Sequence, residues 1–330
     1  MGYPQASGIS LFFMRYIVDK FMRPQALFFK FILVSVLVVA KAQATTSTYQ
    51  PFMWQVQNQG ATVYLVGSIH ALTPDFYPLP AAYEKAFQSA DRLAVELDPE
   101  QLDPNQSARL VQSKMWLPKG VTIDRYLDDK RLTALQQFAK ANQSDYERML
   151  HIRPWMLVEQ LTQAQLKDSD YQAEYGIDLH FLKLAKQKGL PVLEIETLSQ
   201  QISAIADTPF QAQLTMLETS LDQMDDEDYM AKMTEYWRQA DPDGLYQFVY
   251  QDVLDNPKLK PMMEALLDHR NQRMADVISI YLGQSPNRSQ TTFVVVGALH
   301  LSGPKSIIKE LEQKGFYPRP MFQDKNLQKQ

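Results

Sequence analysis

The feature that most constrains the fold is a unit that occurs near both ends of the chain. An apolar, β-branched run leads into Gly-x-x-His, first at Gly67 to His70 and again at Gly297 to His300. Apolar runs that alternate with helical segments are typical of an α/β sheet covered on both faces. The carboxyl ends of parallel strands meet at one edge of such a sheet, where ligands bind. The repeat therefore predicts that two histidines 230 residues apart lie side by side.

A β-hairpin is predicted where the folded part begins. The β-prone residues 52–56 and 62–66 flank a turn that contains Asn58 and Gly60, and such turn residues favour a hairpin. Residues 79–90 then have the apolar pattern of a helix. The order up to this point is strand, strand, helix.

Three further segments extend this α/β pattern. Residues 93–95 form a short apolar run that ends at an acidic residue, and a helix over 176–188 is followed by Gly189 and a strand over 191–196. Glycine after a helical run is a common stop signal. A last helix is predicted over 305–314, directly after a Gly-Pro pair, because proline suits the first turn of a helix.

Two long helical and polar segments interrupt the strands, at about residues 99–170 and 199–285. The sequence therefore predicts an α/β fold with a mixed, mostly parallel central sheet and two helical insertions. We expect residues 45–330 to form one domain.

The first 44 residues resemble a secretory signal peptide. Arg15, Lys20 and Arg23 precede an apolar run over 27–40, which ends in small residues up to Ala44. The run is shorter than the roughly 20 residues that span a bilayer, so a cleaved signal is preferred to a membrane anchor. Export to the periplasm or the medium, with cleavage near Ala44, is the prediction, and Met1, Met14 and Met22 are all possible starts.

Charge and composition narrow the classes of partner. The formal charge is −5, and removing the basic leader leaves about −9, which argues against a nucleic acid or an anionic membrane as partner. The chain has no cysteine, so any metal site must use His, Asp and Glu. The sequence lacks the Gly-x-Ser-x-Gly nucleophile elbow, the P-loop and the His-Glu-x-x-His motif, which argues against the commonest hydrolases and nucleotide-binding proteins.

The paired histidines predict a metal site. His70 and His300 need a third ligand, and Glu96, at the end of its own strand, is the best placed. Glu196 is the second candidate, and a carboxylate that is not a ligand could act as general base. With only nitrogen and oxygen ligands, Mn, Co, Zn and Fe all fit.

Ordinary structural roles account better for other residues. His151, His180 and His269 lack a comparable setting and are expected to be structural. Methionines at near-helical spacing from Met216 to Met233 are expected in the core, the alternative being a flexible peptide groove.

These residues together resemble the TraB/GumN family, which is related to the animal Tiki proteases. The match covers nearly all of the chain after the leader. The motifs that carry it, in order, are Tyr64 to His70, Glu96-Leu97-Asp98, Pro154-Trp155, Gly176-Ile177-Asp178, Leu193 to Thr197, Arg270-Asn271 with Met274, and Val296 to His300.

The resemblance implies a fold like that of erythromycin esterase and the ChaN proteins, and a metal-dependent peptidase that uses both Gly-x-x-His motifs. It also implies that Arg270 and Asn271 are functional polar residues of the second insertion. The leading hypothesis is thus an exported metal-dependent hydrolase of peptides or small molecules. A protein that binds a peptide, haem or another small ligand without turnover is the alternative, and a metal-free esterase with His70 as base is the third.

Overall fold

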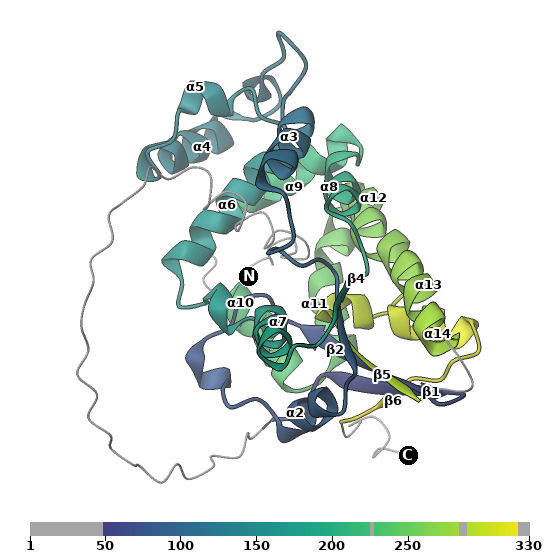
Figure 1. Ribbon diagram of the computed structural model, residues 1–330. Coiled ribbons are helices and arrows are strands. Elements are labelled where there is room, and N and C mark those ends of the chain that lie inside the picture. The colour runs from purple at the N-terminus through teal and green to yellow at the C-terminus, as the bar shows by residue number, and fades with distance from the viewer. Residues whose placement is uncertain (1–48, 225–227, 284–288, 323–330) are drawn as a thin grey trace, which may run out of the picture.

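One six-stranded sheet organises the structure, with strand order β4-β3-β5-β2-β1-β6 (Figure 1). The computed structural model describes residues 49–224, 228–283 and 289–322, so the predicted leader lies outside the described residues. The strands are β1 (Met53–Asn58), β2 (Ala61–Ser68), β3 (Arg92–Val95), β4 (Val192–Glu194), β5 (Gln290–Gly297) and β6 (Arg319–Pro320).

The centre of the sheet is parallel. Strand β5 lies between β2 and β3 and is parallel to both, and β4 extends the parallel part beyond β3. Strand β1 is antiparallel to both β2 and β6. The predicted mixed, mostly parallel sheet is therefore confirmed, while the likeness to erythromycin esterase and ChaN stays a prediction.

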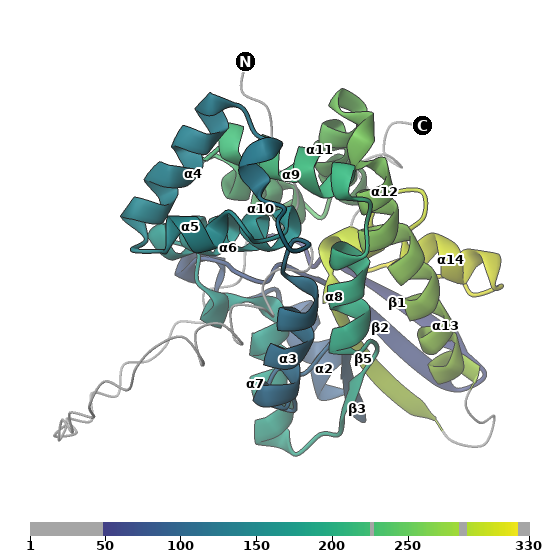
Figure 2. The same ribbon diagram turned by 90° about the horizontal axis from the view of Figure 1, so that it is seen from above.

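Helices cover both faces of the sheet. Figure 2 shows α2 and α7 on one side and α13 and α14 on the other. The helices are α2 (Ala81–Gln88), α3 (Pro104–Lys114), α4 (Asp129–Ala141), α5 (Tyr146–Met149), α6 (Pro154–Asp168), α7 (Ile177–Lys188), α8 (Leu198–Ala206), α9 (Phe210–Asp222), α10 (Tyr229–Arg238), α11 (Pro242–Asp255), α12 (Lys260–Met263), the π-helical η5 (Glu264–Asp268), α13 (His269–Gly283) and α14 (Ile307–Gln313). Short 3-10 turns are η1 (Pro74–Phe76), η2 (Ile123–Arg125), η3 (Ala173–Tyr175), η4 (Pro257–Leu259) and η6 (Ala298–Leu301).

Local sequence signals explain several of these boundaries. The β1–β2 turn places Gln59 and Gly60 at positive φ, as the predicted hairpin requires. Helix α7 ends at Gly189, whose φ of 68° is left-handed. Helix α8 begins with a capping box formed by Thr197 and Gln200.

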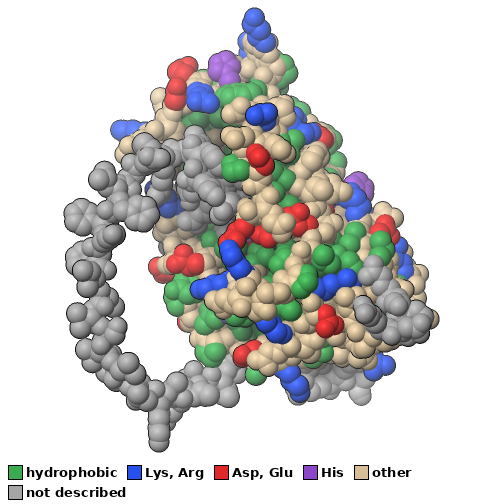
Figure 3. All heavy atoms as spheres, in the orientation of Figure 1, with side chains coloured by type: hydrophobic (Ala, Val, Ile, Leu, Met, Phe, Trp, Pro, Cys, Tyr) green, Lys and Arg blue, Asp and Glu red, His purple; other side chains and the backbone are tan. Residues whose placement is uncertain are grey.

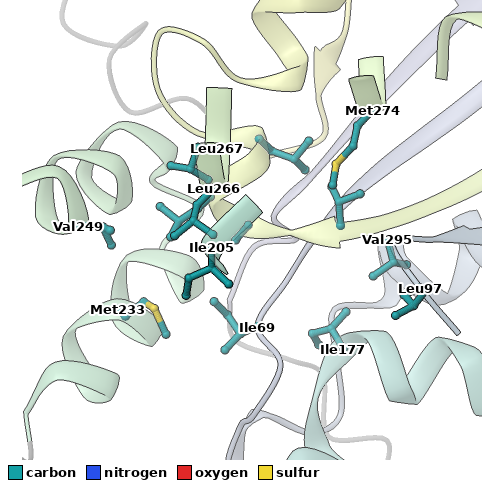
Figure 4. Packing of buried hydrophobic residues seen from close by; sticks show 14 of the residues in the cluster. Ile69, Leu97, Ile177, Ile205, Met233, Val249, Leu266, Leu267, Met274 and Val295 are labelled. Atoms are coloured by element: carbon teal, nitrogen blue, oxygen red, sulfur yellow. The ribbon is translucent and has the colours of Figure 1, made fainter. Parts of the chain in front are cut away.

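The core joins the sheet to the helices of both insertions. Side chains Phe181 and Phe293 lie with ring centroids 4.6 Å apart, which attaches α7 to β5. In Figure 4, Ile205 of α8 lies beside Leu266 of η5, close to the end of β2 that leads into Ile69. Of the four methionines predicted in the core, Met216 and Met233 are buried, and Met224 and Met230 are partly buried against it.

The two motif glycines have ordinary backbone conformations, and the predicted start of the last helix is wrong. Gly67 lies inside β2, and Gly297 has a φ of −52°, so neither glycine adopts the left-handed region. Glycine is required at position 67 for lack of space, because a Cβ there would overlap the ring of Phe52. The last helix begins at Ile307, where the side chain of Ser306 accepts from the backbone, rather than at the Gly-Pro pair.

The surface carries both signs of charge. On the face shown in Figure 3, acidic and basic side chains of the described residues are interspersed with apolar ones. Within residues 49–224, 228–283 and 289–322, every helix is too short or too polar to cross a membrane.

Candidate functional site

Three predicted residues meet at the carboxyl edge of the sheet. His70 follows β2, Glu96 follows β3, and His300 lies in η6 directly after β5, which is the strand between them. The point where a Cβ of Gly297 would stand is 3.4 Å from Glu96 Oε1, 3.5 Å from His300 Cδ2 and 3.8 Å from His70 Nε2. The register pairs Ser68 with Gly297, so the two Gly-x-x-His motifs leave the sheet within one residue of the same level.

His300 is completely buried and is held in one tautomer. Its Nδ1 lies 2.6 Å from Asn271 Oδ1, while Asn271 Nδ2 donates to the carbonyl of Lys305 at 2.8 Å. Because that carbonyl can only accept, the amide oxygen faces His300 and Nδ1 must carry the proton. Nε2 therefore presents a lone pair, and no described residue forms a hydrogen bond with it.

The charge state of His300 also suits this residue to bind a metal or to accept a proton. Burial, together with the nearby guanidinium of Arg270, lowers the pKa of His300 to about 3, although Glu96 opposes the shift. The ring is thus neutral at physiological pH. A neutral imidazole with an unshared lone pair on nitrogen is the form that binds a metal or accepts a proton.

His70 is oriented by Asp178, which the sequence indicates as part of a family motif but not as a site residue. Its Nδ1 lies 3.0 Å from Asp178 Oδ1, and the same oxygen accepts a hydrogen bond from Ser68 Oγ at 2.6 Å. The acceptor fixes the proton on Nδ1 and turns Nε2 toward Gly297. Burial would lower the pKa of His70, but the charge of Asp178 and the hydrogen bond to it raise it above its usual value.

The start of α7 fixes this turn in place. The backbone N–H of Ile177 donates to the carbonyl of Ile69 at 3.1 Å. At Gly176, a Cβ would overlap the backbone carbonyl of His70. Glycine is thus required here for close approach, and α7 delivers Asp178 to the ring of His70.

Glu96 connects the histidines to a buried ion-pair network. Its Oε1 accepts from the backbone N–H of Gly297 at 2.6 Å, and its Oε2 accepts from Arg270 at 2.6 Å. Burial alone would raise the pKa of Glu96, but Arg270 and then His300 hold it well below its usual range. Glu96 is therefore a carboxylate with one oxygen 3.8 Å from His300 Nε2.

Arg270 bridges two strand-end acids. It is fully buried, and it donates to both oxygens of Glu196, with the shortest contact at 2.7 Å. Gln201 Nε2 lies 3.3 Å from Glu96 Oε2 and 3.5 Å from Glu196 Oε2, at the edge of hydrogen-bonding range. Because Arg270 engages both oxygens of Glu196, this acid is arranged as a counter-ion more than as a general base.

The segment before Arg270 is π-helical. Helix η5 ends at Asp268, and Arg270 and Asn271 follow in the first turn of α13. A π-helical segment adds a residue to the turn and changes which side chains face inward, and such segments are frequent at functional sites. Two adjacent residues can thus contact different partners. Arg270 donates to Glu96, and Asn271 hydrogen-bonds to the ring of His300.

The other histidines lie apart from this cluster. His151 is exposed. His180 is on α7 and packs against the ring of Tyr77, with centroids 5.3 Å apart. His269 begins α13, one residue before Arg270, and is exposed.

Two observations bear on whether a metal fits. In the part of the chain that the structure describes, no group of three or more His, Cys, Asp or Glu side chains is spaced to hold a metal ion. The chemistry of the donors nevertheless fits a divalent ion, because two imidazoles of fixed tautomer and one carboxylate surround Gly297. Each imidazole also has the outer hydrogen-bond partner that metal-ligating histidines usually have.

This chain is thus an α/β protein in which two Gly-x-x-His motifs and a strand-end glutamate meet at one edge of the sheet. Residues 52–320 match the sequence model of the TraB/PrgY/gumN family, and the chain belongs to this family.

The chain is 27% identical over 242 residues to the uncharacterized protein YbaP of Escherichia coli K12, covering 73% of this chain and 84% of that protein. It is 23% identical over 317 residues to metalloprotease TIKI2 of Danio rerio, covering 80% of this chain and 60% of that protein. No solved structure matches the chain significantly.

Proposed function

We propose that this protein is a metal-dependent hydrolase of the peptidase type, with His70, His300 and Glu96 as the ligands. The observation that carries the proposal is the buried lone pair of His300 Nε2, which has no described partner and lies beside Glu96. A buried nitrogen without a partner is costly, and a metal ion would satisfy it. The distant similarity to metalloprotease TIKI2 points in the same direction.

A divalent ion bound there would polarise a scissile carbonyl and lower the pKa of a water molecule. The residues around the ion would orient the ligands, set their charge and exclude water. Asp178 and Asn271 hold the two imidazoles in the tautomer that presents Nε2. Arg270 keeps Glu96 ionised, and burial of Glu96 and His300 excludes bulk water.

Substrate would approach from the side of His70. Its side chain is 12% exposed, whereas the side chains of Glu96 and His300 are 3% and 0% exposed. A carbonyl would therefore meet His70 first. Mn, Co, Zn and Fe all suit this ligand set, and we propose a peptide or small molecule as substrate.

A protein that binds its ligand without turnover is the second candidate, and the burial of Glu96 and His300 favours it. The third, a metal-free esterase, draws support from the pair of His70 and Asp178, since a general base is often oriented by a carboxylate. We further propose export, with residues 1–44 as the signal that is removed.

A cleavage assay on a peptide library, with and without a chelator, tests the proposal. We expect cleavage that the chelator abolishes and that added divalent metal restores. The exposed His151 provides a control, because His151→Ala should leave the rate unchanged. Cleavage that persists in chelator would identify the metal-free hydrolase, and metal or ligand binding without cleavage would identify the binding protein.

A further inference from the structure

A second polar feature lies away from the strand ends, in a small cavity between α9, α11 and α12. The cavity is lined by Met216, Met262 and Met263, by aliphatic side chains, and by Asp252. All three methionines are buried. Asp252 is its one ionisable lining residue, and none of the lining residues contributes to the centre around Gly297.

Asp252 is held in an unfavourable environment. Asp252 is 7% exposed, and its Oδ2 has no hydrogen-bond partner among the described residues. Burial, and secondarily the charge of Asp255, raises the pKa of Asp252 to about 7. A buried carboxylate oxygen without a donor is costly, and a cation beside Oδ2 would stabilise the charged form of Asp252.

The size and lining of the cavity limit what can occupy it. It has room for about one water-sized sphere, which is too small for an organic ligand. A buried water molecule needs two to four polar partners, and the lining offers only the carboxyl group beside weakly accepting thioethers. A single ion that accepts sulfur and oxygen ligands fits better.

We propose that this cavity is a site for a soft monovalent cation, Cu(I), with the thioethers of Met216, Met262 and Met263 and the carboxylate of Asp252 as ligands. Thioethers are soft ligands that select Cu(I) over hard divalent ions. The chain has no cysteine and 15 methionines, so methionine is its source of soft ligands. The single negative charge of the carboxylate balances that of the cation.

The proposed Cu(I) site shares no residue with the proposed hydrolase centre around Gly297. Titration of the full protein with Cu(I), under ascorbate and against a coloured Cu(I) chelator, measures its affinity. The His70→Ala/His300→Ala double variant serves as background, so that imidazoles of the other centre cannot contribute. We expect one equivalent of Cu(I) and a sulfur-dominated ligand shell by X-ray absorption.

Two substitutions locate the site. Met262→Leu nearly conserves volume and should keep the fold, and Asp252→Asn removes the charge; each should weaken Cu(I) binding at least tenfold. Met156→Leu, a buried methionine on α6, is the matched control and should bind as the background does. Thermal unfolding of each variant verifies folding. Unchanged affinity in Met262→Leu and Asp252→Asn, or no Cu(I) bound by the background protein, would overturn the proposal.

Discussion

Replacing Arg270 by methionine tests the electrostatic account of the site. Arg270 is fully buried, and its Nη2 lies 2.6 Å from Glu96 Oε2 and 2.7 Å from Glu196 Oε2. Methionine nearly fills the space but removes the charge that both acids share. Two buried carboxylates would then face each other without a counter-ion.

The expected loss of stability is large. Two charges about 5 Å apart at an effective dielectric constant of about 20 repel by roughly 3 kcal/mol. Removing one partner of a buried ion pair typically costs about 3–5 kcal/mol. We therefore expect Arg270→Met to lower the free energy of unfolding by about 4 kcal/mol at pH 7, and the melting temperature by roughly 10 °C.

The pH dependence should reverse sign. In the wild type the folded pKa of Glu96 is lowered, so its stabilisation is complete above the unfolded pKa near 4.5 and is lost as the pH falls toward the folded value. In Arg270→Met the folded pKa of Glu96 should rise above the unfolded value, because burial then acts without the charge of Arg270. The variant should then lose stability as the pH rises above about 4.5, so its deficit is largest at neutral pH.

Urea unfolding between pH 4 and pH 8 measures both effects. Arg273→Met is the matched control, because Arg273 lies on the same helix, is 44% exposed and is 3.8 Å from Glu196 Oε1. Because Arg273 is largely exposed and its contact with Glu196 is long, we expect this pair to contribute at most about 1 kcal/mol. If Arg270→Met were within 1 kcal/mol of wild type with an unchanged pH profile, the electrostatic account would be wrong.

Three further substitutions test the packing and the orientation of the site. Gly67→Ala should destabilise the fold by about 1–3 kcal/mol in urea unfolding, because its Cβ overlaps the Phe52 ring; wild-type stability would contradict this. Gly297→Ala should be tolerated, since its Cβ makes ordinary contacts, whereas the larger Gly297→Val should stay folded by circular dichroism and lose metal binding; equal metal binding by both would refute the reasoning. Asp178→Asn should weaken metal affinity about 10–100-fold in calorimetric titration by releasing His70; unchanged affinity would remove Asp178 from the site.

Much of the fold could be predicted because its signals are local. Gly189 ends α7 and Gly60 turns the hairpin through backbone conformations that the sequence displays. The start of α14 was misplaced because a Gly-Pro pair and a Ser cap compete within a few residues, and the cap at Ser306 determines the start. The function of Gly67 was hidden, since it depends on Phe52 of the neighbouring strand.

The site was predictable where chemistry follows strand ends. His70, Glu96 and His300 could be grouped because parallel strands end at one edge. Asp178 and Ser68, which hydrogen-bond to each other beside His70, were not assigned to the site, although an acid in the first turn of an apolar helix was a usable signal. Arg270 pairs with both Glu96 and Glu196, which lie 174 and 74 positions before it in the sequence. No local sequence pattern encodes such long-range pairs.

The metal content of the two histidine variants tests the central claim most directly. Elemental analysis after equilibration with divalent metal should find about one ion per chain in the wild type and in His151→Ala. His70→Ala and His300→Ala should each lose most of it, and the double variant little more, because ligands of one ion act as a unit. A His300→Ala protein that keeps the wild-type metal content would contradict a shared centre, since His300 supplies the buried Nε2 beside Glu96.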